Sequence, residues 1–103
     1  MSDPNKDPVV QQFREQISDT DLAILDALNR RLSLVEKLHA YKRAQEYDVK
    51  DPSREDWMLT WVERANRGPL SPEAVREFWS LLLPLLTREA ARLLDTESAA
   101  APR

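Results

Sequence analysis

The first half of the chain contains one long amphipathic helical pattern, and this pattern limits the possible folds more than any other feature. From about Pro8 to about Gln45, apolar residues recur at spacings of three and four. A helix of about 38 residues would span about 57 Å, whereas the two later helical patterns would span only about 24 and 36 Å. One copy of the chain cannot easily cover so long a helix. We therefore expect either a break in this helix or a second protomer, and we favour an intertwined homodimer.

Two shorter helical patterns follow, and each begins with a polar residue and a proline. Asp51 and Ser71 are suitable N-caps because their side-chain oxygens can accept hydrogen bonds from the first turn, and proline follows each of them. The second pattern stops at Gly68–Pro69, and the third continues to Leu94. No stretch alternates in the manner of a β-strand. The sequence thus predicts an all-α protomer of three helices in the order long, short, long.

The two ends of the chain have a different composition from the rest. Residues 1–7 (MSDPNKD) and 95–103 (DTESAAAPR) are polar or small. We expect them to be disordered tails on either side of one helical domain at 8–94.

Composition excludes several classes of protein. The 103 residues include no Cys, which rules out disulfides, a Cys-based zinc site and a thiol nucleophile. The longest apolar run, LLLPLL at 81–86, is too short to span a bilayer. With a net charge of -3 and no basic tract, nucleic acid is not expected as a partner. We see no signal peptide either, so we expect a cytoplasmic protein.

Charged residues interrupt the apolar face of the first helix. Alternating steps of three and four along this helix pass through Arg14, Ile17, Asp21, Ile24, Leu28, Arg31, Val35, Leu38 and Lys42. Each cation could set the helix register or extend its charged end into water. Three cations on one face, however, have only one carboxylate beside them. Because Arg31 and Lys42 lie about three turns apart on the same face, an anionic ligand could supply the missing charge.

The segment DPSRED adds a second group of charges shortly after Lys42. Asp51, Arg54 and Glu55 fall in the first turn of the second helix. Capping alone explains the two acidic residues, since carboxylates stabilise helix N-termini. The alternative is a mixed-charge rim that binds the hydroxyl and carboxylate groups of a ligand.

The third helix and the single histidine give weaker signals. Glu89 follows Leu82 and Leu85 on an apolar face, so it either points inward or lies in solvent. His39 has no second histidine or carboxylate at metal-ligand spacing, and we interpret it as a surface or interface residue. No catalytic triad or Gly-rich phosphate loop is present.

Taken together, these residues resemble a known family, the all-α (AroQ-type) chorismate mutases. The opening REQISDTD, from Arg14 to Asp21, matches a motif of that family. The spacing of the charged positions also matches without a gap, at Arg14, Arg31, Lys42, Asp51, Arg54 and Glu55. The resemblance covers about residues 8–94.

The resemblance implies a homodimer that rearranges chorismate to prephenate without a nucleophile, metal or cofactor. Each site would take Arg14 from the second protomer, and Arg14 and Arg31 would hold the substrate carboxylates. Lys42 would bridge a carboxylate and the ether oxygen. Three residues of DPSRED would form the rim: Asp51 and Glu55 at the ring hydroxyl, and Arg54 bracing them.

The third helix departs from the family pattern at two positions. Leu85 falls where many members have a serine that contacts the substrate, and Glu89 where many have a glutamine that donates to the ether oxygen. A carboxyl group can donate only when it is protonated. We therefore expect a raised pKa for Glu89, or activity that falls as pH rises. Pro84 is expected to kink the helix beside the site.

These departures leave two other readings open. The same scaffold could act on 4-amino-4-deoxychorismate, or on isochorismate as a mutase or pyruvate lyase. Alternatively, the chain could be a weak mutase that needs a partner enzyme of the shikimate pathway, or a helical interaction module without activity.

Overall fold

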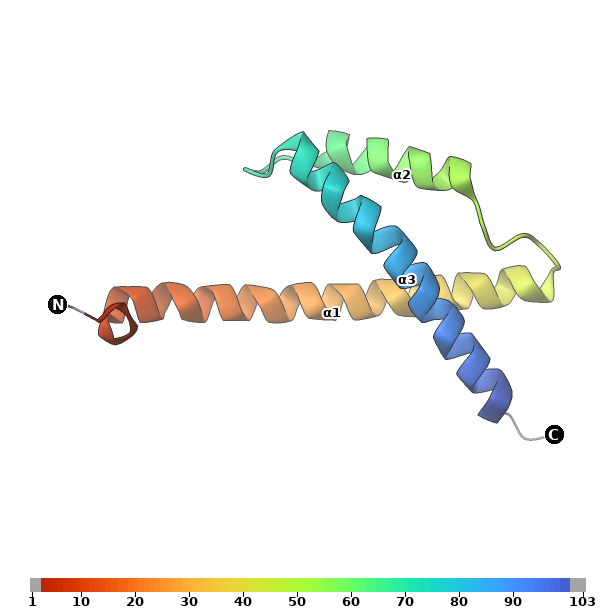
Figure 1. Ribbon diagram of the computed structural model, residues 1–103, viewed down its shortest axis with the longest axis horizontal. Coiled ribbons are helices and arrows are strands. Elements are labelled where there is room, and N and C mark those ends of the chain that lie inside the picture. Colours follow the sequence, from red (N-terminus) through yellow and green to blue (C-terminus); the bar gives the residue numbers. More distant parts are fainter. Residues whose placement is uncertain (1–2, 101–103) are drawn as a thin grey trace. The chain divides into compact units, whose positions relative to one another are not determined.

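The computed structural model describes residues 3–100, with side chains for residues 3–96, and that part of the chain folds into three α-helices without a β-strand (Figure 1). A short 3-10 turn, η1 (Pro4–Lys6), precedes α1 (Pro8–Ala44), α2 (Pro52–Ala65) and α3 (Pro72–Ala100). The predicted all-α protomer with a long, a short and a long helix is therefore confirmed. None of these helices, as far as they are described, is long and apolar enough to cross a membrane.

Contacts divide the chain into an N-terminal unit that ends at Arg31 and a C-terminal unit that begins at Leu32. The N-terminal unit consists of η1 and the first part of α1. Among the described residues of this unit, no second helix packs against α1, and several large apolar side chains are exposed, among them Phe13 at 61% and Ile17 at 59%. A single amphipathic helix of this kind gains little stability on its own, because helices in proteins depend on packing of their apolar face.

The helices continue further at the ends of the chain than the sequence suggests. Part of the tails expected at 1–7 and 95–103 lies outside the described residues. Within the described part, the Asp3 side chain accepts a hydrogen bond from the Asn5 backbone at 2.9 Å and caps η1. At the other end α3 continues to Ala100. Its last two residues, Ala99 and Ala100, are alanines, and alanine has the highest helix propensity.

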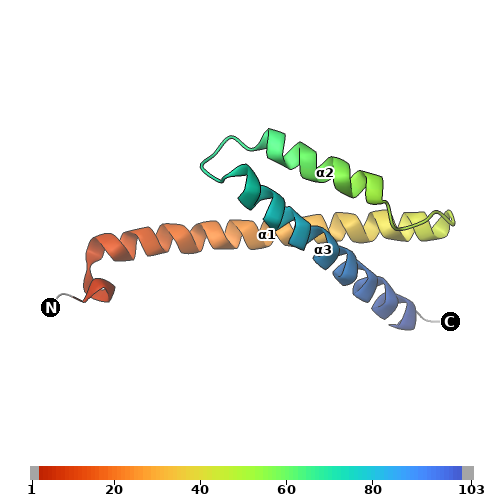
Figure 2. The same ribbon diagram turned by 45° about the horizontal axis from the view of Figure 1, so that its top comes forward.

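The C-terminal unit has its core between α2 and α3 (Figure 2). The most buried apolar residues recur on one face of α3 at helical spacing, and α2, which contacts α3, contributes the buried Val62. These residues are Val62, Val75, Leu82, Leu86, Ala90 and Leu94. Burial of each large aliphatic side chain contributes about 1.5–3 kcal/mol, so this seam is the main source of stability in the unit.

Local sequence signals set where α2 and α3 begin. The Asp51 carboxylate accepts the Arg54 backbone N–H at 3.1 Å, and the Ser71 hydroxyl accepts that of Ala74 at 3.1 Å, so both predicted N-caps are confirmed. α2 ends at Ala65, before the predicted stop at Gly68–Pro69, because Asn66 leaves the helical conformation and its side chain donates to the Leu70 carbonyl at 2.7 Å.

Pro84 lies inside α3, and the helix continues through it without interruption. Proline has no backbone N–H, so the carbonyl of Ser80, four residues earlier, lacks its usual helical donor. The buried residues Leu82 and Leu86 on either side of Pro84 hold the helix against its neighbours at this point.

Candidate functional site

A tight turn at the end of α1 brings Lys42 close to the start of α2. The Tyr47 N–H donates to the Lys42 carbonyl at 2.8 Å, and the Glu46 N–H donates to the Arg43 carbonyl at 3.1 Å. This pair of hydrogen bonds forms a Schellman motif, with Glu46 in the left-handed conformation at φ 60°. The chain then turns back, and the Lys42 ammonium donates to the Val49 carbonyl at 3.5 Å. Lys42 is thus held above the loop that leads into α2.

Asp51, the N-cap of α2, carries a negative charge next to Lys42. Its carboxylate accepts the Arg54 backbone N–H at 3.1 Å and the Ser53 hydroxyl at 2.9 Å. These two hydrogen bonds, with smaller contributions from the charges of Lys42 and Arg54, lower the pKa of Asp51. Asp51 therefore remains ionised, and the structure brings Lys42, Asp51 and Arg54 together, as the sequence predicts for three of the site residues.

Arg54 and Lys42 have no carboxylate partner within the described residues. Three ion pairs are present there: Arg43–Asp95, Arg76–Glu63 and Arg92–Glu89. The guanidinium of Arg54 instead lies 4.0 Å from the centre of the Trp57 ring. Glu55 is exposed in the first turn of α2. In the described part of the chain, Lys42 and Arg54 are thus two cations that no ion pair neutralises.

The other two predicted arginines belong to the N-terminal unit. Arg31 is half-buried, and this burial lowers the pKa of its guanidinium. Arg14 is exposed and donates to the side chain of Asn5. Both lie on α1, and their separation of 17 residues corresponds to about 26 Å along the helix. Arg14 and Arg31 of one protomer therefore cannot contact the same small molecule.

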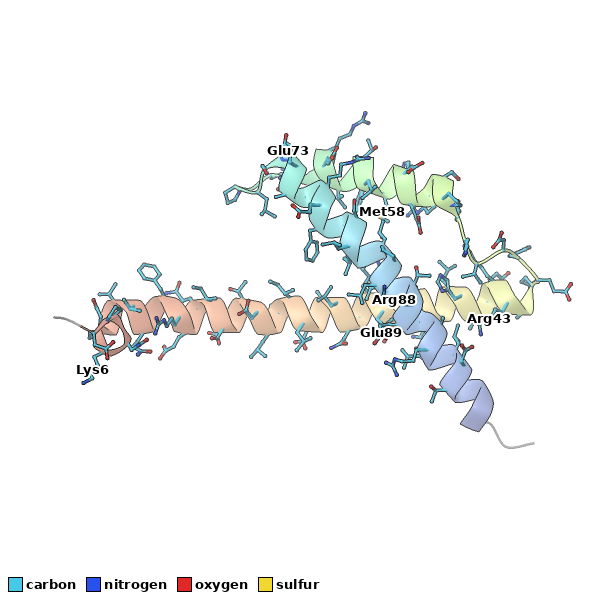
Figure 3. The ribbon with its side chains drawn as sticks, in the orientation of Figure 1. Lys6, Arg43, Met58, Glu73, Arg88 and Glu89 are labelled. Carbon is cyan, nitrogen blue, oxygen red and sulfur yellow. The ribbon has the colours of Figure 1, made fainter. Side chains whose placement is uncertain are left out.

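Glu89 lies on α3, where Figure 3 labels it beside Arg88. Its carboxylate accepts two hydrogen bonds from the Arg92 guanidinium, one from Nε at 3.0 Å and one from Nη2 at 3.2 Å. These hydrogen bonds, followed by the charges of Arg92 and Arg88, lower the pKa of Glu89. The expected raised pKa of Glu89 is therefore wrong for this protomer. Leu85, one turn before Glu89, is 43% exposed.

His39 differs from its prediction, because only 8% of the residue is exposed. Burial, followed by the positive charges of Lys42 and Arg43, lowers the pKa of His39, so it is neutral at physiological pH. Leu38, which the sequence places on the buried face, is 51% exposed. Val35 and Lys42 are half-buried as expected, so the inward face of α1 in this unit differs from the predicted one mainly in that it contains His39 and not Leu38. Leu38 and His39 both lie at helical spacing from Val35, so the sequence pattern alone does not distinguish them.

The arrangement is suited to binding an anion. Lys42 and Arg54 are cations without an ion-pair partner in the described part of the chain, and Asp51 next to them can accept a hydrogen bond from a hydroxyl group. Among the described residues, no three His, Asp or Glu side chains are grouped so that they could hold a metal ion. A carboxylate-bearing ligand with a hydroxyl group would therefore match the charges at this rim.

A comparison with protein families gives an independent result. Residues 13–90 match the family model described as Chorismate mutase type II. This range includes every residue that the sequence predicts for the site, from Arg14 to Glu89. Comparisons with curated proteins and with solved structures gave no significant match.

Proposed function

Since the chain belongs to the chorismate mutase type II family, we propose that it catalyses the rearrangement of chorismate to prephenate. The observation that carries this proposal is the family match over residues 13–90, which contains all of the predicted charged positions. The enzyme would be an isomerase, and its product would feed the synthesis of phenylalanine and tyrosine in the cytoplasm.

The proposed reaction needs no group from outside the substrate. One carbon–oxygen bond of the enolpyruvyl ether breaks while one carbon–carbon bond forms, and no atom is gained or lost. The protein's contribution is to hold the reactive conformation and to stabilise the negative charge that develops on the ether oxygen. Lys42 would donate to this oxygen and to a carboxylate. Its ammonium is held at the rim by the Val49 carbonyl, which supports this role.

The remaining residues would bind the rest of the substrate. Arg31 would hold one carboxylate, and its partial burial strengthens such an ion pair because water is partly excluded. Asp51 and Glu55 would accept hydrogen bonds from the ring hydroxyl, and Arg54 would brace this rim. Leu85 and Glu89 would face the substrate from α3. Glu89 could donate to the ether oxygen only in its protonated form.

We propose further that two protomers form an intertwined dimer and share each site. Two features of the N-terminal unit support this. Arg14 lies about 26 Å from Arg31 along α1, so it can join a site built around Arg31 only from a second copy. Phe13 and Ile17, its neighbours on the same helix, are exposed apolar residues that a second copy would cover.

A second substrate class is favoured by one observation. Leu85 is a partly exposed apolar side chain at a position where many family members have a serine that contacts the substrate. Without that hydroxyl, the site loses one hydrogen bond to the substrate. This change would suit a close analogue, 4-amino-4-deoxychorismate or isochorismate. A weak mutase that a shikimate-pathway enzyme activates is consistent with the same departure.

Purified protein should be assayed with chorismate, isochorismate and 4-amino-4-deoxychorismate from pH 5 to 8, with the products separated. Formation of prephenate from chorismate, at the highest kcat/KM of the three, is the expected result. Turnover of none of the three, alone or with enzymes of the shikimate pathway added, would contradict an enzymatic function. A higher kcat/KM for one of the two analogues would identify that analogue, and not chorismate, as the substrate.

A further inference from the structure

An aromatic stack lies on the outer face of α2, beside the rim of the proposed site. Arg54, Trp57 and Trp61 follow one another at spacings of three and four, which place them on one face of a helix. The Arg54 guanidinium is 4.0 Å from the centre of the Trp57 ring. The Trp57 and Trp61 rings are stacked, with 5.7 Å between their centres and 10° between their planes. We call these three residues the Arg–Trp stack.

Packing of the core does not explain the Arg–Trp stack. The side of α2 that packs on α3 carries Val62, which is buried, with Met58 and Leu59 half-buried beside it. Trp57 and Trp61 are 48% and 51% exposed. Two large rings that remain half in solvent contribute little to a core. Their ring contacts are with Arg54 and with each other.

The contact with Trp57 changes what Arg54 can do. An arginine usually gains order by pairing with a carboxylate, and such a pair neutralises its charge and occupies its N–H groups. A ring face attracts the guanidinium through its quadrupole and accepts none of these N–H groups in conventional hydrogen bonds. Arg54 is therefore held in place while it keeps its full charge and its donors.

Two carboxylates close to Arg54 could have paired with its guanidinium and occupied its N–H groups. Asp51 is three residues away, but its carboxylate accepts the backbone N–H of Arg54 and the Ser53 hydroxyl. Glu55 is the next residue along α2, and no ion pair between Arg54 and Glu55 is present. The Trp57 ring thus holds the guanidinium away from the acidic residues on either side of it.

We propose that Trp57 is a positioning residue that presents Arg54, as a charged and unpaired hydrogen-bond donor, to an anionic group of the substrate. This inference rests on the proposed function, since it assigns the anion to a carboxylate of chorismate. It gives Arg54 a direct contact with the substrate in place of the bracing role proposed above.

The first measurement tests the contact without any substrate. The Nε–H resonance of Arg54 should show an upfield ring-current shift in the wild-type protein, because it lies near a ring face. Trp57→Leu should abolish this shift, Trp57→Phe should retain part of it, and Trp61→Leu should retain most of it. The absence of the shift from the wild type would overturn the inference.

The second measurement tests the consequence for the reaction. Trp57→Leu should raise KM for chorismate roughly two- to fivefold, the factor that corresponds to an exposed cation–π contact. The kcat should remain unchanged, because a contact that binds substrate and transition state equally affects KM alone. Trp57→Phe should restore KM towards the wild-type value. Trp61→Leu is the matched control, since it removes a tryptophan of the same stack and leaves the Arg54 contact in place.

The outcomes separate the inference from the proposed function. If the wild type turns over chorismate and Trp57→Leu keeps the wild-type KM, the positioning role is wrong and the function remains. If Trp61→Leu raises KM as much as Trp57→Leu, the effect belongs to the helix surface in general and the inference is again wrong. If the wild type neither binds nor converts chorismate, the proposed function fails and the inference fails with it.

Discussion

Both carboxylate oxygens of Glu89 accept hydrogen bonds from one guanidinium, that of Arg92, three residues further along α3. This pairing favours the ionised carboxylate and raises the pKa of Arg92 in return. At the position where many chorismate mutases carry a glutamine that donates a hydrogen bond, this protomer therefore holds a group that can only accept. Arg92 opposes the protonation that a donor role for Glu89 requires.

The first prediction concerns the pH at which Glu89 can donate. Because the pKa of Glu89 is lowered in the folded protein, its protonated fraction falls as pH rises through that lowered value. If Glu89 donates to the ether oxygen, kcat/KM falls over the same pH range. Arg92→Gln removes the charge and should shift this fall to higher pH. The pH–rate profile and an NMR titration of the Glu89 carboxyl carbon measure the two effects separately.

Arg88→Gln is the matched control for Arg92→Gln. Arg88 contributes less to the pKa of Glu89 than Arg92 does, so its removal should shift the profile less. A carboxyl pKa that rises in Arg92→Gln without any change in the pH–rate profile would show that Glu89 takes no part in proton donation.

The second prediction tests whether the site is shared between protomers. Arg14→Ala and Lys42→Ala should each be inactive, since each removes a charge that binds the substrate. After subunit exchange, a mixture of the two variants should recover activity. In the proposed dimer, a mixed pair has one site that lacks both residues and one site that has both. At equal concentrations, about a quarter of the wild-type activity is therefore expected from random pairing of shared sites.

The control for this exchange is a mixture of Arg31→Ala with Lys42→Ala. Both residues would come from the same protomer in the proposed site, so every site of a mixed dimer lacks one of them and no activity should return. Recovery in this control, or none in the first mixture, would contradict the proposed division of residues.

The third prediction separates the two roles of Asp51. Its carboxylate caps α2, and the proposed reaction also uses it at the substrate hydroxyl. Serine is as good an N-cap as aspartate, so Asp51→Ser should leave the free energy of unfolding within a few tenths of a kcal/mol while activity falls. Asp51→Ala should lose activity and also about 1 kcal/mol of stability.

Ser71→Ala serves as the comparison, because it removes the N-cap of α3 at a distance in sequence from the proposed site residues of α2. It should lower stability by about 1 kcal/mol and leave kcat/KM unchanged. Chemical denaturation and initial-rate assays measure the two quantities. Asp51→Ser with full activity would reduce Asp51 to a capping residue.

The fourth prediction follows from the buried His39. Its pKa in the folded protein lies below the ordinary value of 6.5. Between these two values the unfolded chain binds more protons than the folded one, so stability should be full above about pH 6.5 and should fall as pH decreases below it. His39→Gln should remove this dependence. Because His39 is the sole histidine, few other groups titrate between pH 5.5 and 6.5.

Unfolding by urea at a series of pH values, for the wild type and His39→Gln, gives the measurement. A wild-type protein whose stability is constant down to pH 5.5 would show that His39 is accessible to protons in the folded state. The same result would contradict the burial described above.

Features set by neighbouring residues were predictable from the sequence. The N-caps at Asp51 and Ser71 and the starts of α2 and α3 depend on contacts within one turn, and they were placed correctly. The grouping of Lys42 with Asp51 and Arg54 also followed from their nearness in sequence. The individual charged residues predicted no site by themselves, and their spacing along the three helices was needed to predict one.

Features set by packing or by competing partners were not predictable in the same way. The burial of His39 and the exposure of Leu38 depend on which side of α1 the rest of its unit covers, and a three-and-four pattern leaves that uncertain by one residue. Glu89 could pair with Arg92 or point towards the substrate, and the sequence shows both options. At the end of α1, Glu46 adopts the left-handed conformation at a position that glycine usually occupies. The sequence therefore gives no signal for this turn.

The length of α1 has a genetic consequence if the proposed dimer forms. Each chain lends Arg14 to one site and contributes Arg31 and Lys42 to another, so neither site belongs to a single gene copy. Consider a dimer of a wild-type chain and a chain that carries both Arg14→Ala and Lys42→Ala. One of its sites would lack Arg14 and the other would lack Lys42, so neither site would be complete. Such an allele would act as a dominant negative, whereas either single substitution would be complemented by the other in the same cell.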